Sequence, residues 1–477
     1  MRPHAAAALL VLGTLGLGPS QAAAEAYPWV ALGPDDLRVV PDPKLEAALR
    51  LEMVRRAKKT IDIANYDQRA DAAIALPLAS ALRDAANRGV RVRFMVSWNT
   101  TVLFDYYNKV GELLVDPPAA TPIEYLVVGG PNGEDQGFGL LEGLHEKYFL
   151  VDRTDLVTTG RGIGEAYLYW LDCAYALRGP LAAQAQQSFD RIWREARLHH
   201  APYAGYLGGQ TQQRAPRYPE SKTTWLAPHE LAERDALLAW FAASPAPSAS
   251  PSKGVTAGAR GRLLHFDFLK QIHALSPTPV EVDVDERLTK LDDPVVKAIL
   301  WRLATAKVVR IALISTILPP PLLQALLAAK RRGADITLFI NTCAPRLNTK
   351  RTPIEAGGTL WSMQLPDLDD LLSAGVRVVG FQIRDGSPWL FLHKKLAVLD
   401  DVAIFGSHNL NVPSSAFFDE ASFEIESPAL ARDLAARFDA DLLANGEPID
   451  PARVRRDRNK LAPRLLRWLS LPYLGYM

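Results

Sequence analysis

The chain of 477 residues contains only two cysteines, and Lys and Arg outnumber Asp and Glu by only 54 to 53. So few cysteines exclude a disulfide-rich scaffold, and the absence of a CxxC pair argues against a zinc site. The formal net charge is +1, so the chain has no large excess of basic residues such as dedicated nucleic-acid-binding proteins carry. A local basic patch that binds nucleic acid remains an alternative. After the N-terminal segment no run of about 18 apolar residues occurs, so no later membrane span is expected.

The N-terminus has the pattern of a secretory signal. Basic residues are followed by the apolar run AAAALLVLGTLGLG and then by SQAAAEA, which offers small-residue cleavage sites after Ala24 or Ala26. The apolar run is short for a membrane span, and an uncleaved anchor remains an alternative. We therefore expect an exported protein, periplasmic or extracellular. There Cys173 and Cys343 either form a disulfide or stay as two buried thiols.

The length suits two domains or two fused halves, and a hydrophobic content of 48% is that of a globular protein. The segment AASPAPSASPSKG has the composition of a flexible connection. These features predict five parts: a signal peptide at 1–26, a first half at 27–241, a linker at 242–262, a second half at 263–446 and a basic tail at 447–477.

A short motif occurs once in each half. LHEKYFLVD at 144–152 and LHKKLAVLD at 392–400 share a histidine, a lysine two positions later, four apolar residues and an aspartate. In an extended chain the histidine and lysine face the same way, whereas the aspartate, five residues after the lysine, falls on the other face. The spacing shared by the two halves picks out six positions: His145, Lys147 and Asp152, and His393, Lys395 and Asp400.

The repeat extends beyond the motif. KKTIDIANY and AKVVRIALI both have the pattern of early strands, and each is followed by a helix that ends near a glycine, Gly89 or Gly333. Asp172 follows His145 by 27 residues, and Glu420 follows His393 by 27. Alternating strands and helices predict an α/β fold, with one α/β/α sandwich per half and one shared site at their interface.

Two histidines, two lysines and two carboxylates suit phosphodiester exchange. A neutral imidazole can attack phosphorus, and an opposed imidazolium can protonate the leaving oxygen. Lysines supply positive charge to the non-bridging oxygens, and a carboxylate on the second ring nitrogen orients each imidazole. Asp172 and Glu420 are the candidates for that carboxylate. Ser407 and Asn409 of GSHN lie two residues apart, so both are candidate hydrogen-bond donors to the phosphate.

The motif His-x-Lys-x4-Asp followed by Gly-Ser-x-Asn resembles the signature of the phospholipase D superfamily. GSHNLNVPSSAFFDEASFEI and TTGRGIGEAY are similar to segments of bacterial cardiolipin synthases. The resemblance implies a ping-pong reaction through a phosphohistidine, with no metal or cofactor. It implies that His145 is the nucleophile and His393 the general acid. Lys147 and Lys395 would bind the phosphate, and the motif aspartates would have structural roles.

Three positions depart from the family pattern. Gly162 stands where the family has asparagine, Thr159 where it has glycine, and Ser97 where it often has aspartate. Gly162 removes an amide donor, which would weaken phosphate binding or open space for an unusual substrate. No histidine or lysine of the motifs is lost, so an active enzyme is expected.

We expect a phospholipid substrate resembling phosphatidylglycerol, and no protein partner can be inferred. The alternatives are an exported nuclease and a catalytically silent membrane-binding protein. The tail PARVRRDRNKLAPRLLRWLSLPYLGYM combines basic and aromatic residues. It is either a membrane-surface anchor or a helix docked on the protein with a solvated basic face.

Overall fold

The computed structural model describes most of the chain between Tyr27 and Leu461, and the fold below refers to that part. The signal peptide, most of the linker, Cys343 and the last residues of the tail lie outside it. Within these limits, the positions not described are 69–70, 72, 99, 101–109, 112–113, 116–118, 130–141, 200–225, 244–254, 256–257, 277–281 and 343–357.

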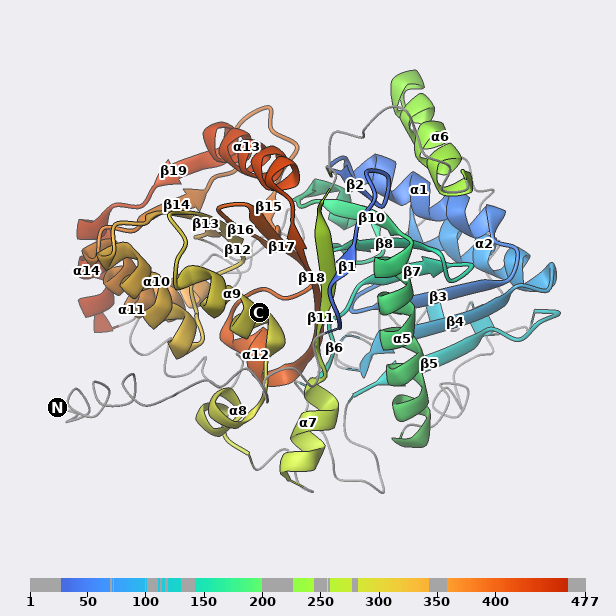
Figure 1. The fold of residues 1–477 in the computed structure, drawn as a ribbon, viewed down its shortest axis with the longest axis horizontal. Helices are drawn as coiled ribbons and strands as arrows, with labels where there is room; N and C mark the ends of the chain where they lie inside the picture. The colour runs from blue at the N-terminus through green and yellow to red at the C-terminus, as the bar shows by residue number, and fades with distance from the viewer. Residues whose placement is uncertain are drawn as a thin grey trace.

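The first sheet has seven strands in the order β2-β10-β8-β7-β3-β4-β5 (Figure 1). The strands β3, β4 and β5 are parallel, and the remaining neighbours are antiparallel. The bounds are β2 Leu37–Val40, β3 Thr60–Asn65, β4 Arg91–Ser97, β5 Glu124–Val128, β7 Tyr148–Val151, β8 Asp155–Thr159 and β10 Ala174–Arg178.

The second sheet follows the order β1-β11-β18-β17-β16-β12-β13-β14-β19. Its members are β1 Val30–Ala31, β11 Arg260–Phe266, β12 Val308–Leu313, β13 Asp335–Asn341, β14 Arg377–Phe381, β16 Leu396–Leu399, β17 Val402–Gly406, β18 Phe418–Glu426 and β19 Gly446–Pro448. From β11 to β14 the order and directions match those from β2 to β5 in the first sheet. The expected α/β fold is thereby confirmed, and the two sheets share one strand order.

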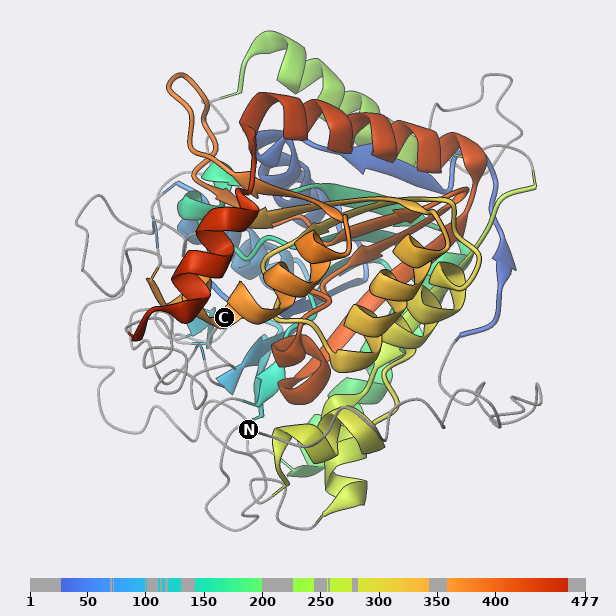
Figure 2. The same ribbon diagram turned by 90° about the vertical axis from the view of Figure 1, so that its left-hand side faces the viewer.

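Helices cover the sheets. The outer core of the first sheet packs against α1, α2 and α6, and that of the second against α9, α10 and α11. Figure 2 shows α13 on the opposite side of the second sheet from α9 and α10. The bounds are α1 Pro43–Arg56, α2 Ala75–Asn87, α5 Pro180–His199, α6 Pro228–Ala242, α7 Phe268–Leu275, α8 Val284–Lys290, α9 Pro294–Leu303, α10 Pro320–Arg331, α11 Gly358–Ser373, α12 Val412–Phe417, α13 Pro428–Asn445 and α14 Pro451–Asn459.

One large core joins the two sheets. It combines α5 and α13 with side chains from both sheets, and Tyr175 of β10 stacks on Phe405 of β17 with ring centroids 3.6 Å apart. Both rings are almost fully buried. Burial of a large apolar side chain stabilises a fold by about 1.5–3 kcal/mol, so such contacts hold the halves firmly together.

The predicted helix ends are confirmed. Gly89 and Gly333 directly follow the C-caps of α2 and α10, with φ angles of 90° and 91°. Glycine adopts this left-handed conformation without the steric cost of a Cβ, which explains its place where a helix gives way to a strand.

The motif aspartates hold the hairpin turns in place. Asp152 and Asp400 both have φ of 51°, and their carboxylates accept hydrogen bonds from backbone amides just before β3 and β12, respectively. The turn that begins at Asp400 has two residues and the turn that begins at Asp152 has three. These hydrogen bonds give both aspartates a structural role.

The described part of the tail is a docked helix. Within α14, Val454 is fully buried, and Asp457 accepts a hydrogen bond of 3.1 Å from the Trp361 indole of α11. Within the described residues, no helix combines the length and apolar character needed to cross a membrane. The role of the residues after Leu461 stays a prediction.

Candidate active site

Two short parallel ladders cross the boundary between the halves. Strand β6 (Gly143–Leu144), which leads into the first motif, pairs with the start of β18, and β15 (Phe391–Leu392), which leads into the second, pairs with β9 (Trp170–Leu171). The backbone continues the pattern, since the His145 amide donates to Asp419 and the His393 amide donates to Leu171, both at 2.9 Å. Each histidine is thus anchored to the strand of the other half that carries a carboxylate.

The carboxylates are paired crosswise as well. His145 Nδ1 lies 2.9 Å from Glu420 Oε1, and His393 Nδ1 lies 2.9 Å from Asp172 Oδ2. All four side chains are buried, with no more than 6% of their surface exposed. An ionised carboxylate can only accept, so it fixes the hydrogen on Nδ1 and leaves Nε2 as the reactive nitrogen.

The two lysines fold back toward their histidines. Lys147 Nζ donates to the His145 carbonyl at 2.8 Å, and Lys395 Nζ donates to the His393 carbonyl at 2.9 Å. Lys395 Nζ also lies 3.0 Å from both ring nitrogens of His393. Both ammonium groups are buried beside the imidazoles, where they can face an anionic phosphate.

Ser407 and Asn409 differ in their hydrogen-bond partners. The Ser407 hydroxyl donates to Glu420 and accepts from the Ala421 amide at 2.9 Å, so in this structure it holds the carboxylate. Its direct contact with phosphate stays a prediction. Asn409 is 4% exposed, and its side-chain oxygen has no hydrogen-bond partner among the described residues. That oxygen can only accept a hydrogen bond, so the contact of Asn409 with a phosphate also stays a prediction.

The two His–carboxylate pairs have different surroundings. Glu420 receives a further hydrogen bond of 2.5 Å from Ser414, a residue that the sequence patterns did not single out. Gly160 stands beside Asp172 in the place that Ser407 has beside Glu420, and a Cβ there would overlap the Asp172 carboxylate. Asp172 instead accepts from the Cys173 amide at 2.7 Å. The site is therefore chemically asymmetric.

Gly162 does not open space for a substrate. A Cβ at this position would collide with the carbonyl oxygen of Asp67 and approach the Tyr167 ring to 2.9 Å. The backbone of 67–68 and the Tyr167 ring fill the volume that a side chain would need. The expectation of added room was wrong, because the neighbouring chain has closed in on the glycine.

Burial is the largest single influence on the pKa values of the site residues. It lowers the pKa of His145 to about 4, against the attraction of Glu420, and it lowers the pKa of Lys147 to about 8. Burial raises the pKa of Glu420, but the attraction of His145 outweighs it and brings this pKa down to about 2. Burial, together with Lys395 and Lys147, depresses the pKa of His393 well below its usual value.

Asp172 differs from Glu420, because burial raises its pKa despite the attraction of Lys395 and Arg161. The Asp172 carboxylate is thus more easily protonated than the Glu420 carboxylate. Charges of the two motifs act on each other, since Lys395 lowers the pKa of His145 and Lys147 lowers that of His393.

Aromatic side chains enclose the imidazoles. Tyr66 meets His145 edge-on with ring centroids 4.5 Å apart, and the Trp170 centroid lies 4.4 Å from that of His393. Arg161 donates a hydrogen bond of 2.5 Å to the Asp172 carbonyl and so holds the backbone at this carboxylate. Sequence reasoning missed these three residues, although Tyr66 and Arg161 lie in the quoted segments KKTIDIANY and TTGRGIGEAY.

Comparison with known proteins agrees with this geometry. Residues 300–442 match the family model described as the PLD-like domain of cardiolipin synthase. Cardiolipin synthase C of Escherichia coli is 29% identical over 160 residues, which cover 31% of this chain and 32% of that protein. An uncharacterized protein of Helicobacter pylori is 26% identical over 168 residues, 30% of this chain and 31% of its own length. The matched region thus spans about a third of these curated relatives.

A solved structure shares the fold over nearly the whole chain. Phosphatidylserine synthase of Haemophilus influenzae superposes with a TM-score of 0.58 and 14% identity, covering 94% of each chain. The twice-repeated motif and the match over residues 300–442 make the chain similar to proteins of the phospholipase D superfamily. The likeness to phosphatidylserine synthase shows that the fold is shared. Within that superfamily, the matching family model is that of cardiolipin synthase.

Proposed function

We propose that the protein is a metal-independent phosphodiesterase or phosphatidyltransferase that acts on phospholipids through a phosphohistidine. The observation that carries the proposal is the pair of buried imidazoles, each held at Nδ1 by a carboxylate of the other half and each flanked by a buried lysine. This arrangement offers a nucleophile, a proton donor and positive charge at one point.

In the first step His145 Nε2 attacks phosphorus, and the bond from phosphorus to the head-group oxygen breaks. His393 donates its proton to the departing oxygen, so an alcohol leaves. In the second step the hydroxyl of water or of an alcohol attacks the phosphohistidine and gives its proton to His393, which releases His145. The low pKa of His145 keeps its imidazole neutral, as a nucleophile requires.

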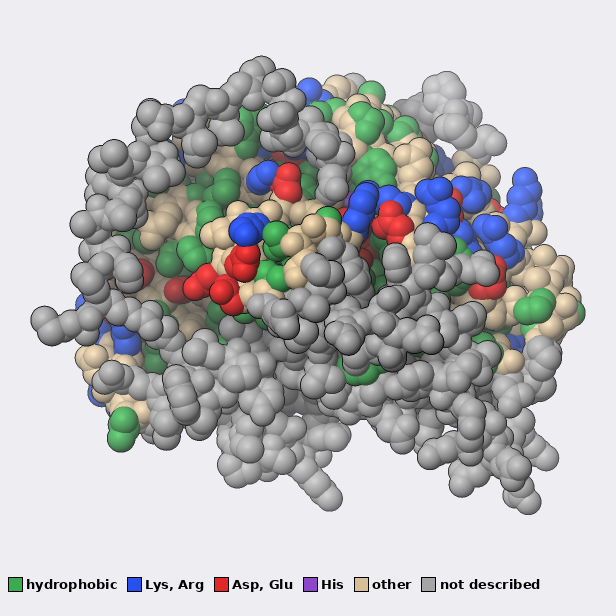
Figure 3. Space-filling model, turned by 90° about the horizontal axis from the view of Figure 1, so that it is seen from below, with side chains coloured by type: hydrophobic (Ala, Val, Ile, Leu, Met, Phe, Trp, Pro, Cys, Tyr) green, Lys and Arg blue, Asp and Glu red, His purple; other side chains and the backbone are tan. Residues whose placement is uncertain are grey.

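Several features support a lipid as substrate. The matching family model is that of a cardiolipin synthase domain, and the signal-like N-terminus and the basic, aromatic tail suit work at a membrane surface outside the cytoplasm. In the view of Figure 3, Lys and Arg side chains gather over the first half and acidic side chains over the second. Such a division could orient the protein on an anionic membrane.

The test is to incubate the purified mature protein with phosphatidylglycerol vesicles and a chelator, and to identify the products by mass. Cardiolipin and glycerol would indicate a transferase, whereas phosphatidic acid would indicate a phospholipase D. The variants His145→Ala and His393→Ala should lose at least a factor of about 10² in rate. His229→Ala, an exposed histidine on α6, is the matched control and should behave like the wild type.

Two outcomes would contradict the proposal. Turnover of single-stranded DNA without turnover of any phospholipid would identify a nuclease. Vesicle binding without any product would identify a silent membrane-binding protein.

A further inference from the structure

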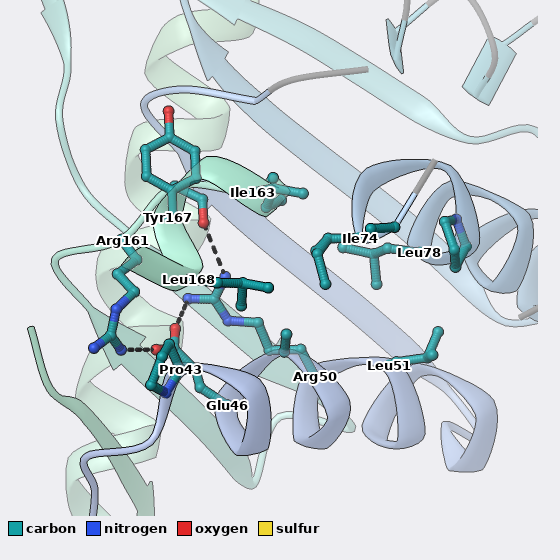
Figure 4. A pocket seen from close by; sticks show the side chains of 15 residues that line it. Pro43, Glu46, Arg50, Leu51, Ile74, Leu78, Arg161, Ile163, Tyr167 and Leu168 are labelled. Atoms are coloured by element: carbon teal, nitrogen blue, oxygen red, sulfur yellow. Dashed lines mark hydrogen bonds and ion pairs between the residues drawn. The ribbon is translucent and has the colours of Figure 1, made fainter. Parts of the chain in front are cut away.

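A pocket lies beside the active site, between α1, the start of α2 and the loop from Arg161 to Leu168 (Figure 4). It encloses about 550 Å³ of free space, its open mouth included. The catalytic chemistry described above uses none of this space. Arg161 nevertheless connects the two places, because it lines the pocket and also donates to the Asp172 carbonyl at 2.5 Å.

The charged wall of the pocket carries an excess of positive charge. Arg50 of α1 is 8% exposed and pairs with Glu46, and Arg161 is 2% exposed and pairs with the same carboxylate. Two guanidinium groups therefore share one anion within the pocket wall. A buried positive charge without full compensation is costly, which favours the entry of an anion.

Arg50 has a donor to spare. Its terminal nitrogens bond to Glu46 and, at 3.4 Å, to the Gly162 carbonyl, but its Nε has no hydrogen-bond partner among the described residues. The nearby acids Asp67 and Asp71 are engaged elsewhere, with the Tyr167 hydroxyl and with the backbone amides of Ile74 and Glu165. The carboxylates that act on the Arg50 guanidinium are Glu46 and, more weakly, Asp172, while Arg161 opposes them.

The opposite wall is apolar. Leu51 of α1 and Ile74, Pro77 and Leu78 at the start of α2 line it, and Figure 4 shows Ile74 and Leu78 across the pocket from the loop that carries Ile163 and Leu168. An apolar wall facing a guanidinium is suited to a ligand with two parts, an anionic head and a hydrocarbon chain.

We propose that this pocket binds a single-chain anionic amphiphile, with its head group on Arg50 and its chain along the α2 wall. A carboxylate or a phosphate would serve as the head, since either accepts from a guanidinium. A fatty acid and a lysophospholipid-like phosphate are thus two sources of the same chemistry. The site is separate from the one at His145 and His393, and its occupation does not depend on turnover.

Calorimetric titration of the full-length protein tests the proposal with four probes below their micelle-forming concentrations: decanoate, decyl phosphate, decanol and inorganic phosphate. Decanoate, decyl phosphate or both should bind, and decanol and inorganic phosphate should bind at least roughly tenfold more weakly. Comparison of the two anionic probes identifies the head group. Equal binding of decanol would show that charge plays no part and would overturn the proposal.

Variants locate the bound probe. Arg50→Gln should weaken binding roughly tenfold or more, whereas Arg55→Gln, on the same helix and paired with Glu52, should not. Ala47→Phe keeps every charge and fills the pocket from α1, so it should also abolish binding and covers the case in which Arg50→Gln fails to fold. Binding lost in Lys395→Ala but kept in Arg50→Gln would place the probe in the active site and refute the proposal.

Discussion

At the scale of single residues, the buried lysines carry the charge that a phosphate would meet. Lys147 has no carboxylate hydrogen-bonded to its ammonium among the described contacts and donates instead to the His145 carbonyl. Burial therefore lowers its pKa to about 8, within reach of ordinary buffers. Binding of an anion should consequently depend on pH through this side chain.

Sulfate affinity, measured by calorimetry, should fall as the pH rises through about 8. Lys147 is cationic below its pKa and neutral above it, so the loss should approach about tenfold per pH unit on the alkaline side. Lys147→Arg keeps its charge and should shift the decline to much higher pH. The same decline in Lys147→Arg would assign it to another group.

Gly162 gives a second prediction at this scale. Because its neighbours leave no room for a Cβ, Gly162→Ala and Gly162→Asn should both lower the free energy of unfolding by about 1–3 kcal/mol, as measured by urea denaturation. If Gly162 instead matters because it lacks an amide donor, Gly162→Asn alone should raise the activity. In that case neither variant should change the free energy of unfolding.

At the scale of helices and strands, the sequence predicted most of the scaffold. Apolar runs such as Tyr148–Val151 and glycines after helices predicted β7 and the ends of α2 and α10, because these signals are local. The aspartate of each motif was also assigned correctly to a structural role. Alternation along a strand was enough to separate it from the histidine and lysine.

The pairing of the active-site residues could not be predicted in the same way. Asp172 and Glu420 were found from equal spacing within each half, yet each contacts the histidine of the other half, across 221 and 275 positions of sequence. Such contacts depend on how β6 and β15 dock against β18 and β9. The neighbours Ser414, Trp170 and Tyr66 were missed for the same reason.

At the scale of the whole molecule, crossed pairing assigns each carboxylate to one chemical step. Under the proposed mechanism Glu420 orients the nucleophile His145, so Glu420→Gln should slow attack on every substrate. Asp172 orients the proposed proton donor His393, so Asp172→Asn should impair proton donation and matter mainly for alkoxide leaving groups. Each loss should be of the order of 10²-fold where the step limits the rate.

Hydrolysis of bis(p-nitrophenyl) phosphate distinguishes the two, since nitrophenolate leaves without a proton. Asp172→Asn should retain most of its rate on this substrate while losing its rate on phospholipids, and Glu420→Gln should lose both. The reverse pattern would mean that each carboxylate acts within its own half.

The short strand β1 has a further consequence, for the order in which the chain can fold. Val30 and Ala31 pair with Gly261 and Arg260, so a segment near the start of the chain waits for a partner synthesised some 230 residues later. Contacts so distant in sequence slow folding and leave strand edges open to wrong partners meanwhile. During synthesis or export, the first strand to emerge would be among the last to find its place.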